Sequence, residues 1–172
     1  MRGTGRKKPN NSSIQFPDGV TVLALKHGSA TLPCYINSHD YHTISSMRWC
    51  AKRSRKTYYA VSATTGRIVR MHRLLTGGLA DHKDRNGLNN RRSNLRQANT
   101  AQNNVNRAPS TSLRGITKIP SGWRAHISQN NKFVHLGVFP TAVLAAQAYD
   151  AAGKRLFGEF FIPNFPEVTN VN

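Results

Sequence analysis

Four side chains in the middle of the sequence have the chemistry and the spacing that hydrolysis of a phosphodiester requires. Asp81 and His82 are adjacent, Asn94 lies 12 residues beyond His82, and Asn103 lies 9 residues beyond Asn94. A carboxylate can hold a divalent cation, and an imidazole whose pKa is near neutrality can take a proton from water. Neighbouring side chains on a strand point in opposite directions, so Asp81 can hold the metal while His82 reaches the water. The set predicts a phosphodiesterase site that uses one metal ion.

The segments around these residues predict how the site is built. Residues 87–90 contain one glycine and two asparagines, which indicates a turn between two short strands. Residues 100–106 begin a helix that Asn99 or Thr100 caps. This order of strand, strand and helix can bring Asn103 back over the predicted metal site.

Other polar residues of the segment have a structural interpretation. Asp84 and Asn86 are expected to cap or shape the loop rather than touch a metal ion. Asn89 and Asn90 are expected to be turn residues rather than ligands. His72 is expected to pack or to contact a phosphate rather than to act in catalysis.

The segment resembles the HNH nucleases, and specifically the homing endonucleases that phages and introns encode, over residues 71–107. The matching stretches are His72-Arg73-Leu74, Asp81-His82-Lys83-Asp84-Arg85-Asn86, Asn89-Asn90-Arg91, Asn94-Leu95-Arg96 and Thr100-Ala101-Gln102-Asn103. The resemblance implies that Asp81 and Asn103 bind one Mg²⁺ or Mn²⁺ ion per active site. It also implies that His82 is the general base and that Asn94 hydrogen-bonds its ring. Asn103 stands where the family name has its last histidine, and its oxygen suits these ions better than zinc, so zinc is not expected in the active site. No structural zinc is expected either, because Cys34 and Cys50 form no CxxC pair and the chain has no regular Cys/His ligand spacing.

The charge of the chain indicates a nucleic-acid partner. The sequence has 25 Lys and Arg against 7 Asp and Glu, a net charge of +18. Residues 1–110 contain 19 Lys and Arg and 4 Asp and Glu, a net charge of +15. Residues 111–172 contain 6 Lys and Arg and 3 Asp and Glu, a net charge of +3. Such an excess favours a polyanion, and double-stranded DNA is the expected one. The expected phosphate contacts near the metal site are Arg91, Arg92, Arg96 and Arg107. A predicted hairpin carries Arg48, Lys52, Arg53, Arg55 and Lys56, which form either a phosphate-gripping loop or a solvated turn.

The C-terminal part resembles the plant ethylene-response-factor (AP-two/ERF) DNA-binding domain over residues 113–165. The matching stretches are Arg114-Gly115-Ile116, Trp123-Arg124-Ala125-His126-Ile127, Leu136-Gly137-Val138-Phe139, Ala145-Ala146-Gln147-Ala148-Tyr149-Asp150 and Phe157-Gly158-Glu159-Phe160. The resemblance implies a three-stranded antiparallel sheet that lies in the major groove and is backed by one helix. The expected DNA contacts of this part are Arg114, Lys118, Arg124, His126 and Lys132.

Alternation gives the same two faces of this sheet independently of the resemblance. Trp123, Ala125 and Ile127 point one way, towards the helix, while Arg124 and His126 point the other way. The helix is expected over residues 140–157, with Gly158 ending it. Its apolar positions, spaced by three and four residues, are Ala145, Ala148, Tyr149 and Ala152.

We therefore expect an α+β protein whose mixed N-terminal region ends in a ββα-metal HNH core. The expected divisions are a basic arm at 1–13, a β-rich region with the nuclease core at 14–107 (core 71–107), a linker at 108–112 and the AP-two/ERF-like domain at 113–172. No secretory signal and no apolar run of ~20 residues is found, so the expected location is the cytoplasm, that of a bacterial host if a phage encodes the protein. A monomer without a small-molecule cofactor is expected, and Cys34 and Cys50 are expected to be reduced thiols.

The expected activity is that of a site-directed DNA endonuclease of the homing type. It leaves 5′-phosphate and 3′-hydroxyl ends, as a nick or as a double-strand break. A catalytically inactive DNA-binding regulator is the first alternative, and a metal-dependent plasmid nicking assay separates it. A basic RNA-binding protein is the second alternative. It explains the net charge but gives no role to the carboxylate of Asp81, the imidazole of His82 and the two carboxamides.

Overall fold

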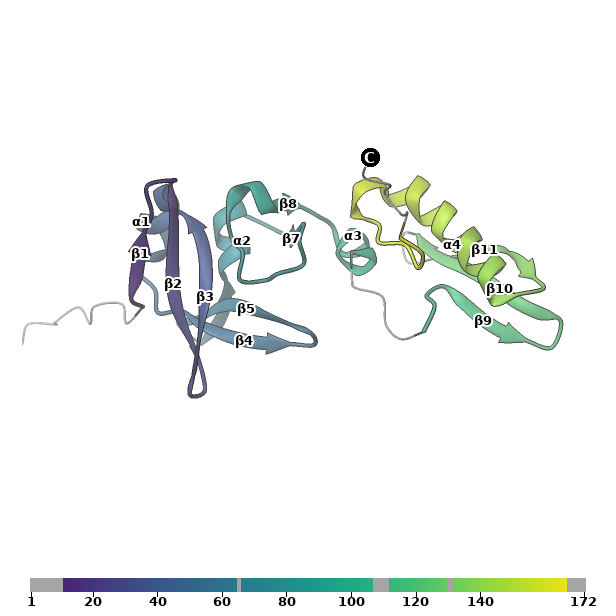
Figure 1. Cartoon of the computed structure of the whole chain (residues 1–172), viewed down its shortest axis with the longest axis horizontal. Helices are drawn as coiled ribbons and strands as arrows, with labels where there is room; N and C mark the ends of the chain where they lie inside the picture. Colours follow the sequence, from purple (N-terminus) through teal and green to yellow (C-terminus); the bar gives the residue numbers. More distant parts are fainter. Residues whose placement is uncertain (1–10, 65, 107–111, 130–131, 167–172) are drawn as a thin grey trace, which may run out of the picture. The chain divides into compact units, whose positions relative to one another are not determined.

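Strands dominate the structure and a few helices accompany them, which confirms the expected α+β class (Figure 1). The structure is a computed structural model that describes residues 11–64, 66–106, 112–129 and 132–166. The chain divides into two compact units, Met1–Ala98 and Asn99–Asn172. Most of the expected basic arm, Arg107 and linker residues 108–111 lie outside the described residues. Among the described residues, no helix is long and apolar enough to cross a membrane.

A six-stranded sheet forms the body of the first unit. Its strands are β1 (Ser13–Gln15), β2 (Val20–His27), β3 (Ala30–Asn37), β4 (Cys50–Ser54), β5 (Thr57–Thr64) and β6 (Arg67–Arg70). The strand order is β1-β2-β4-β5-β6, and β3 pairs with β2. The predicted basic hairpin is β4–β5. Strand β4 continues through Ser54, and only Arg55 and Lys56 form the turn.

The nuclease segment follows this sheet in the chain. Helix α2 (Met71–Thr76) begins directly after β6 and ends at Gly77, whose φ of 74° is favourable for glycine. Strands β7 (Ala80–His82) and β8 (Leu95–Gln97) then pair antiparallel, with the short 3-10 helix η2 (Arg92–Asn94) before β8. Earlier in the chain, η1 (Ser38–Asp40) and α1 (Tyr41–Ile44) connect β3 to β4.

One hydrophobic core joins the nuclease segment to the sheet. Its buried members are Leu23, Leu25, Cys34, Ile36, Ile44, Trp49, Ala51, Ala60, Met71, Leu75, Leu88 and Leu95. Met71 and Leu75 come from α2, while Leu88 and Leu95 come from the β7–β8 segment. The N-terminal strands are therefore the support on which the nuclease segment packs, rather than a separate domain.

The second unit contains the expected three-stranded antiparallel sheet with one helix. The strands are β9 (Ile116–Ile119), β10 (Gly122–Gln129) and β11 (Lys132–Phe139), in the order β11-β10-β9. Helix α4 (Ala142–Phe157) packs against the sheet, and η3 (Gly158–Phe160) follows it. Thr141 caps α4 through its side chain, so the helix begins after Pro140 rather than at it, and it ends at Gly158 as expected.

The core of the second unit follows the predicted alternation. Ala125 and Ile127 of β10 are 0% and 2% exposed and face α4. From the helix, Ala145, Tyr149 and Ala152 are buried as expected, but Ala146 is fully buried where Ala148 was predicted. A β-bulge between Ala125 and His126 shifts the β10–β11 register, which changes the alternation of side chains along β11.

The boundary between the units differs from the predicted linker. It falls at Ala98 and Asn99, so helix α3 (Thr100–Val105) belongs to the second unit. Asn99 caps α3 with the reciprocal hydrogen bonds of a capping box. Val105 contacts the core of the second unit, and its carbonyl accepts from the Ile162 amide at 3.4 Å. The helix and the β7–β8 hairpin of the predicted ββα core are both present, and their association into one metal site stays a prediction.

Candidate active site

Asp81 lies in the middle of β7, opposite Arg96 on β8. The Arg96 guanidinium donates to Asp81 Oδ2 at 3.2 Å, and the two side chains are only 9% and 15% exposed, Arg96 and Asp81 respectively. Arg96 was expected to bind DNA phosphate, but its guanidinium is bound to Asp81. This charge-assisted contact fixes the direction of the carboxylate that is predicted to hold the metal.

His82 is the neighbouring residue on β7 and is almost fully buried, with 3% of its surface exposed. Its Nε2 lies 3.2 Å from Asn90 Oδ1. Burial lowers the pKa of the ring, and this effect outweighs the Asn90 hydrogen bond and the negative charges of Asp84 and Asp81, which raise it. The imidazole is therefore held in the neutral form that can accept a proton.

The partner of His82 is not the predicted one. Both amide hydrogens of Asn94 are donated elsewhere, to Asp84 Oδ1 and to the Asn89 carbonyl, each at 2.8 Å. Asn94 Oδ1 accepts from the backbone amide of Asp84 at 3.0 Å. Asn94 therefore closes the loop between β7 and β8, and the structure gives the contact with the His82 ring to Asn90.

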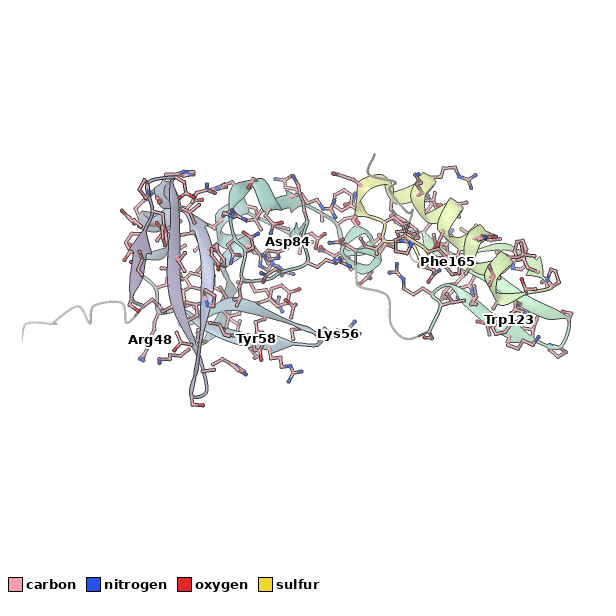
Figure 2. The ribbon with its side chains drawn as sticks, in the orientation of Figure 1. Arg48, Lys56, Tyr58, Asp84, Trp123 and Phe165 are labelled. Carbon is pink, nitrogen blue, oxygen red and sulfur yellow. The ribbon has the colours of Figure 1, made fainter. Side chains whose placement is uncertain are left out.

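Asp84 shapes this loop through its side chain, as expected (Figure 2). Its carboxylate accepts from Asn89 Nδ2 at 2.6 Å, from the Asn86 amide at 2.8 Å and from Asn94. Burial alone would raise the pKa of Asp84, but these three hydrogen bonds outweigh it and the pKa lies below its usual value. The anion and its three donors make a rigid loop around His82.

The loop is anchored to β3 by backbone hydrogen bonds. The Tyr35 amide donates to the Leu88 carbonyl at 2.8 Å, and the Asn90 amide donates to the Tyr35 carbonyl at 2.7 Å. A parallel bridge between Tyr35 and Asn89 completes this contact. Asn90, which is fully buried, is thereby placed by strand β3 rather than by its own neighbours in the chain.

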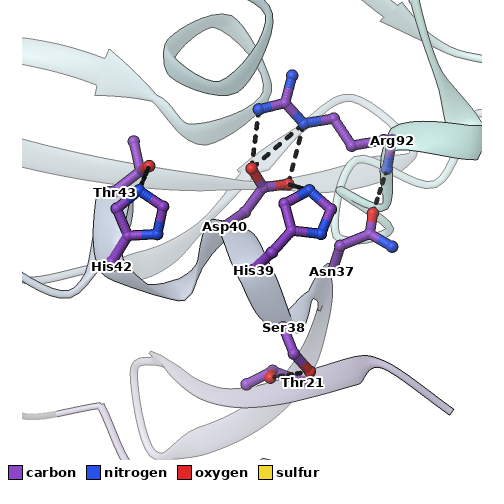
Figure 3. Close-up of polar contacts among 8 residues, drawn as sticks. All are labelled: Thr21, Asn37, Ser38, His39, Asp40, His42, Thr43 and Arg92. Atoms are coloured by element: carbon purple, nitrogen blue, oxygen red, sulfur yellow. Dashed lines mark hydrogen bonds and ion pairs between the residues drawn. The ribbon is translucent and has the colours of Figure 1, made fainter.

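Arg92 provides a second anchor (Figure 3). Its backbone amide donates to Asn37 Oδ1 at 2.7 Å. Its guanidinium forms three hydrogen bonds with the buried carboxylate of Asp40: Nη2 to Oδ1 at 2.8 Å, Nε to Oδ2 at 3.0 Å and Nε to Oδ1 at 3.3 Å. Arg92 was expected to grip DNA phosphate, but the pairing of a nearly fully buried Asp40 makes its role structural. Arg91 is turned inward as well, because its Nε donates to Asn89 Oδ1 at 2.9 Å.

Two rings, those of His72 and Tyr59, pack against the general-base candidate and form a cluster of three rings with it. The His72 ring meets His82 edge-on at 4.7 Å between centroids, and Tyr59 lies 5.6 Å from His72 and 5.8 Å from His82. Burial, followed by the charge of His82, lowers the pKa of His72 to about 3, so His72 stays neutral. The expected packing role of His72 is confirmed by its 4% exposure. Gly87 lies so close to Tyr58 and Tyr59 that an added Cβ would be 2.3 Å from the Tyr58 carbonyl oxygen.

The basic hairpin places its cations on two faces. Lys52 pairs in register with Tyr59 and so lies on the face that holds the three rings, whereas Arg53 pairs with Tyr58 on the opposite face. Lys52, Arg53, Arg55 and Lys56 are all exposed. Arg48 is exposed too, but it precedes β4 and is far from Lys56 at the tip, so it does not belong to the hairpin cluster (Figure 2).

A comparison of the sequence with known proteins indicates the family of the chain. The chain is 31% identical over 166 residues to an uncharacterized HNH endonuclease of Acanthamoeba polyphaga mimivirus, an alignment that covers 90% of this chain and 87% of the relative. The chain belongs to the HNH endonuclease family. No family model matches the sequence, and no solved structure matches the chain.

HNH nucleases generally depend on a divalent metal ion, and the donors of this HNH endonuclease fit a hard one. Among the described residues, no three His, Cys, Asp or Glu side chains gather where they could hold an ion. A metal at Asp81 would therefore have one carboxylate, carboxamide oxygens such as that of Asn103, and water or phosphate oxygens. Mg²⁺ accepts such a set, because it keeps several waters and needs few protein carboxylates. Asn103 lies on α3 in the second unit, and its pairing with Asp81 stays a prediction.

The open face of the second unit's sheet is the other candidate binding surface of this nuclease. Arg124 and His126 lie on it as predicted, and they line a hollow together with Thr117, Phe133 and His135. Phe133 is 79% exposed, and its ring meets that of His126 edge-on at 5.5 Å. The face therefore combines one permanent cation with two histidines and an aromatic ring.

Two other predicted DNA contacts of the second unit point away from this face. The Arg114 guanidinium donates to the backbone carbonyls of Val105 and Ile162, so it ties α3 to the C-terminal segment of its unit. Lys118 pairs in register with Trp123, and its ammonium lies 5.1 Å from the indole centroid. Arg114 is therefore held within its unit, whereas Lys118 is exposed and lies on the face opposite to Arg124.

Two further residues, Lys132 and Arg107, were predicted to contact DNA. Lys132 begins β11 opposite Gln129 and is exposed. By register it lies on the side of Ile127 rather than of Arg124. Arg107 lies outside the described residues.

Sequence reasoning missed two residues of the site, Asn90 and Tyr59. Asn90 was interpreted as part of a turn, although it is the second of two asparagines in the HNH-like stretch and the next residue along is arginine. Tyr59 lies in the sequence beside the basic hairpin, with no motif that links it to His82. Strict alternation along β5 could have placed Tyr59 and Lys52 on one face, but nothing local indicates that this face meets His82.

Proposed function

We propose that this HNH endonuclease cleaves a phosphodiester of double-stranded DNA with one Mg²⁺ or Mn²⁺ ion, at a site chosen in part by its second unit. The ends produced are a 5′-phosphate and a 3′-hydroxyl. The observation that carries the proposal is the β7–β8 hairpin, where a fixed carboxylate and a buried neutral imidazole occupy adjacent positions. A protein with this pair and a net charge of +18 has the means to hold a polyanion and to activate water beside it.

The chemistry assigned to the chain's own residues is proton transfer and orientation. The neutral ring of His82 takes a proton from the attacking water, whose oxygen bonds to phosphorus while the bond from phosphorus to the 3′ oxygen breaks. The 3′ oxygen then takes a proton from solvent. The charges of Asp84 and Asp81 stabilise the imidazolium that forms, because both favour the protonated ring. Asp81 and Asn103 would hold the divalent ion, which would supply positive charge that stabilises the scissile phosphate and the departing oxygen.

DNA binding is assigned to the cations that are not bound inside the protein. Lys52 lies on the side of β4–β5 that faces the three rings, so it is the nearest hairpin cation to the site by register. Arg53, Arg55 and Lys56 extend the same hairpin with exposed positive charge. In the second unit, Arg124 and His126 with the exposed Phe133 form the surface proposed to read DNA, in the manner of an AP-two/ERF-like sheet.

Nicking of a supercoiled plasmid tests the proposed reaction. Wild type is expected to convert the plasmid to open-circular or linear form with Mg²⁺ or Mn²⁺, and to lose activity in EDTA. His82→Ala should abolish cleavage with nearly unchanged DNA affinity, because the ring serves the transition state. His42→Ala is the matched control, because His42 is an exposed histidine of α1.

The same assay separates the nuclease from the inactive regulator. Asp81→Ala should remove the metal dependence together with the activity. Cleavage that continues in EDTA would contradict the metal site. Tight DNA binding without any cleavage, in wild type and under every divalent ion supplied, would favour the regulator instead.

A further inference from the structure

Behind His82 lies a line of buried side chains that the reaction itself does not use. His82 Nε2 faces Asn90 Oδ1 at 3.2 Å, and Asn90 Nδ2 donates to Cys34 Sγ at 3.3 Å. Cys34 Sγ in turn donates to Met71 Sδ at 3.8 Å. Met71, Cys34 and Asn90 are all 0% exposed. The line connects the start of α2, the middle of β3, the loop and β7 through side chains alone.

The direction of each hydrogen bond in this line is determined at its far end. A thioether sulfur carries no hydrogen and can only accept, so Met71 takes the thiol hydrogen of Cys34. Burial raises the pKa of Cys34 to about 12, which keeps that hydrogen on the sulfur. With its one hydrogen given to Met71, the thiol can offer Asn90 only a lone pair. Asn90 must therefore present its Nδ2 to the sulfur and its Oδ1 to His82.

The orientation of the Asn90 amide determines which ring nitrogen of His82 carries the hydrogen. A neutral imidazole has one N–H and one lone pair. Because the Asn90 oxygen can only accept, Nε2 must be the N–H nitrogen, and the lone pair is at Nδ1. If the amide turned over, its Nδ2 would face the ring and the tautomer would be reversed. Strand β3 fixes only the Asn90 backbone, whose amide donates to the Tyr35 carbonyl at 2.7 Å, so the thiol of Cys34 determines which way the side-chain amide faces.

We infer that Cys34 and Met71 are positioning residues for the nuclease reaction: through Asn90 they select the His82 tautomer whose basic nitrogen is Nδ1. Neither residue touches substrate or metal in this assignment. The assignment rests on the proposed role of His82 as general base. Its direct prediction concerns the position of a hydrogen atom, and it can be measured in the absence of DNA.

The test is nitrogen-15 NMR of the full chain labelled at the histidine rings, at about pH 8, where an ordinary histidine is neutral. The wild-type His82 ring is expected to show one protonated Nε2 and one unprotonated Nδ1. Observation of the reversed tautomer in wild type would overturn the inference without any variant. Because this readout requires neither DNA nor metal, it stays interpretable even if the protein proves not to be a nuclease.

Variants then test whether the sulfur atoms cause the selection. Cys34→Ala removes the acceptor of Asn90 and should give mixed tautomers, with kcat for plasmid nicking reduced roughly tenfold and KM changed by less than about twofold. Cys34→Ser keeps an acceptor and should restore both signals in large part. Met71→Leu keeps the volume but lets the thiol hydrogen turn to Asn90, so it should also mix the tautomers. Cys50→Ala is the matched control, because Cys50 is the exposed cysteine.

The outcome that contradicts the assignment is equally specific. If Cys34→Ala and Met71→Leu both keep the pure Nε2-protonated ring, the sulfur atoms do not determine the tautomer. If Cys34→Ala does not fold, Met71→Leu and the wild-type spectrum still decide. A fall in kcat with an unchanged tautomer would mean that Cys34 acts only through packing, and it would overturn the inference as well.

Discussion

The buried His72 should make the first unit sensitive to acid, and its replacement by phenylalanine should relieve this. The folded protein holds His72 at a pKa of about 3, against 6.5 for an ordinary histidine. Below pH 6.5 the His72 ring is therefore protonated in the unfolded chain but stays neutral in the folded protein. The free energy of unfolding consequently falls as the pH drops from 6.5 towards 3. Linkage gives a loss of about 2.7 kcal/mol at pH 4.5, two pH units below the unfolded value. Phenylalanine keeps a ring of similar size beside Tyr59 and cannot take up the proton.

Urea unfolding at pH 7 and at pH 4.5 measures this effect. Trp49 is 3% exposed in the core of the first unit and reports its unfolding, and a Trp123→Phe background removes the indole of the second unit. The free energy of unfolding should fall between the two pH values by about 2.7 kcal/mol more in the parent than in His72→Phe. At pH 7 the variant should be at least as stable as the parent, because within the described residues His72 Nδ1 has no hydrogen-bond partner to lose.

The control is His42→Gln, since His42 is exposed and should leave the acid dependence of the parent unchanged. His82 is buried with a lowered pKa too and remains in the variant, so part of the acid sensitivity should persist. An equal loss of stability in the parent and in His72→Phe, to within about 0.5 kcal/mol, would refute the reasoning. It would mean that His72 reaches solvent when protonated.

Two further predictions compare neighbouring cations. Arg92→Ala should lower the free energy of unfolding of the first unit by about 2 kcal/mol in urea, because it leaves the buried Asp40 carboxylate without its bidentate partner. Arg91→Ala should cost less than half of this, and equal losses would count against the anchor. Arg124→Ala should weaken duplex DNA binding by about 1–3 kcal/mol if it contacts a base edge, as measured by fluorescence anisotropy. Lys118→Ala should change affinity by less than about twofold, because its ammonium sits over the indole on the other face; matching losses would contradict this.

Local signals in the sequence predicted most elements of the fold. The Asn99 cap of α3 and the end of α4 at Gly158 depend on residues within a few positions of each other. Alternation along β10 predicted which side chains enter the core, because a strand has only two faces. The register shift next to His126 was not predicted, since a bulge adds one residue without a composition signal of its own.

The details of the site could not be predicted in the same way. Asn90 and Asn94 have the same side chain and lie on the same loop, so the sequence alone cannot tell which carboxamide meets the His82 ring. Long-range contacts make this choice. The Asn90 backbone amide donates to the Tyr35 carbonyl of β3, whereas the Asn94 side chain hydrogen-bonds to Asp84. These contacts join segments that are far apart in the chain, and no periodicity encodes them.

The same contacts change what the net charge means. Four cations predicted to meet DNA contact partners within the protein: Arg92 contacts Asp40, Arg96 contacts Asp81, Arg114 contacts two carbonyls and Lys118 contacts an indole. Acidic residues are scarce, so two of the few carboxylates are used to fix arginines around the β7–β8 hairpin. The cations behind the net charge of +18 therefore have two separate roles. Some make the candidate active site rigid, and others attract DNA. The attraction depends on cations without such partners, and the exposed β4–β5 hairpin carries four of them in one short stretch: Lys52, Arg53, Arg55 and Lys56.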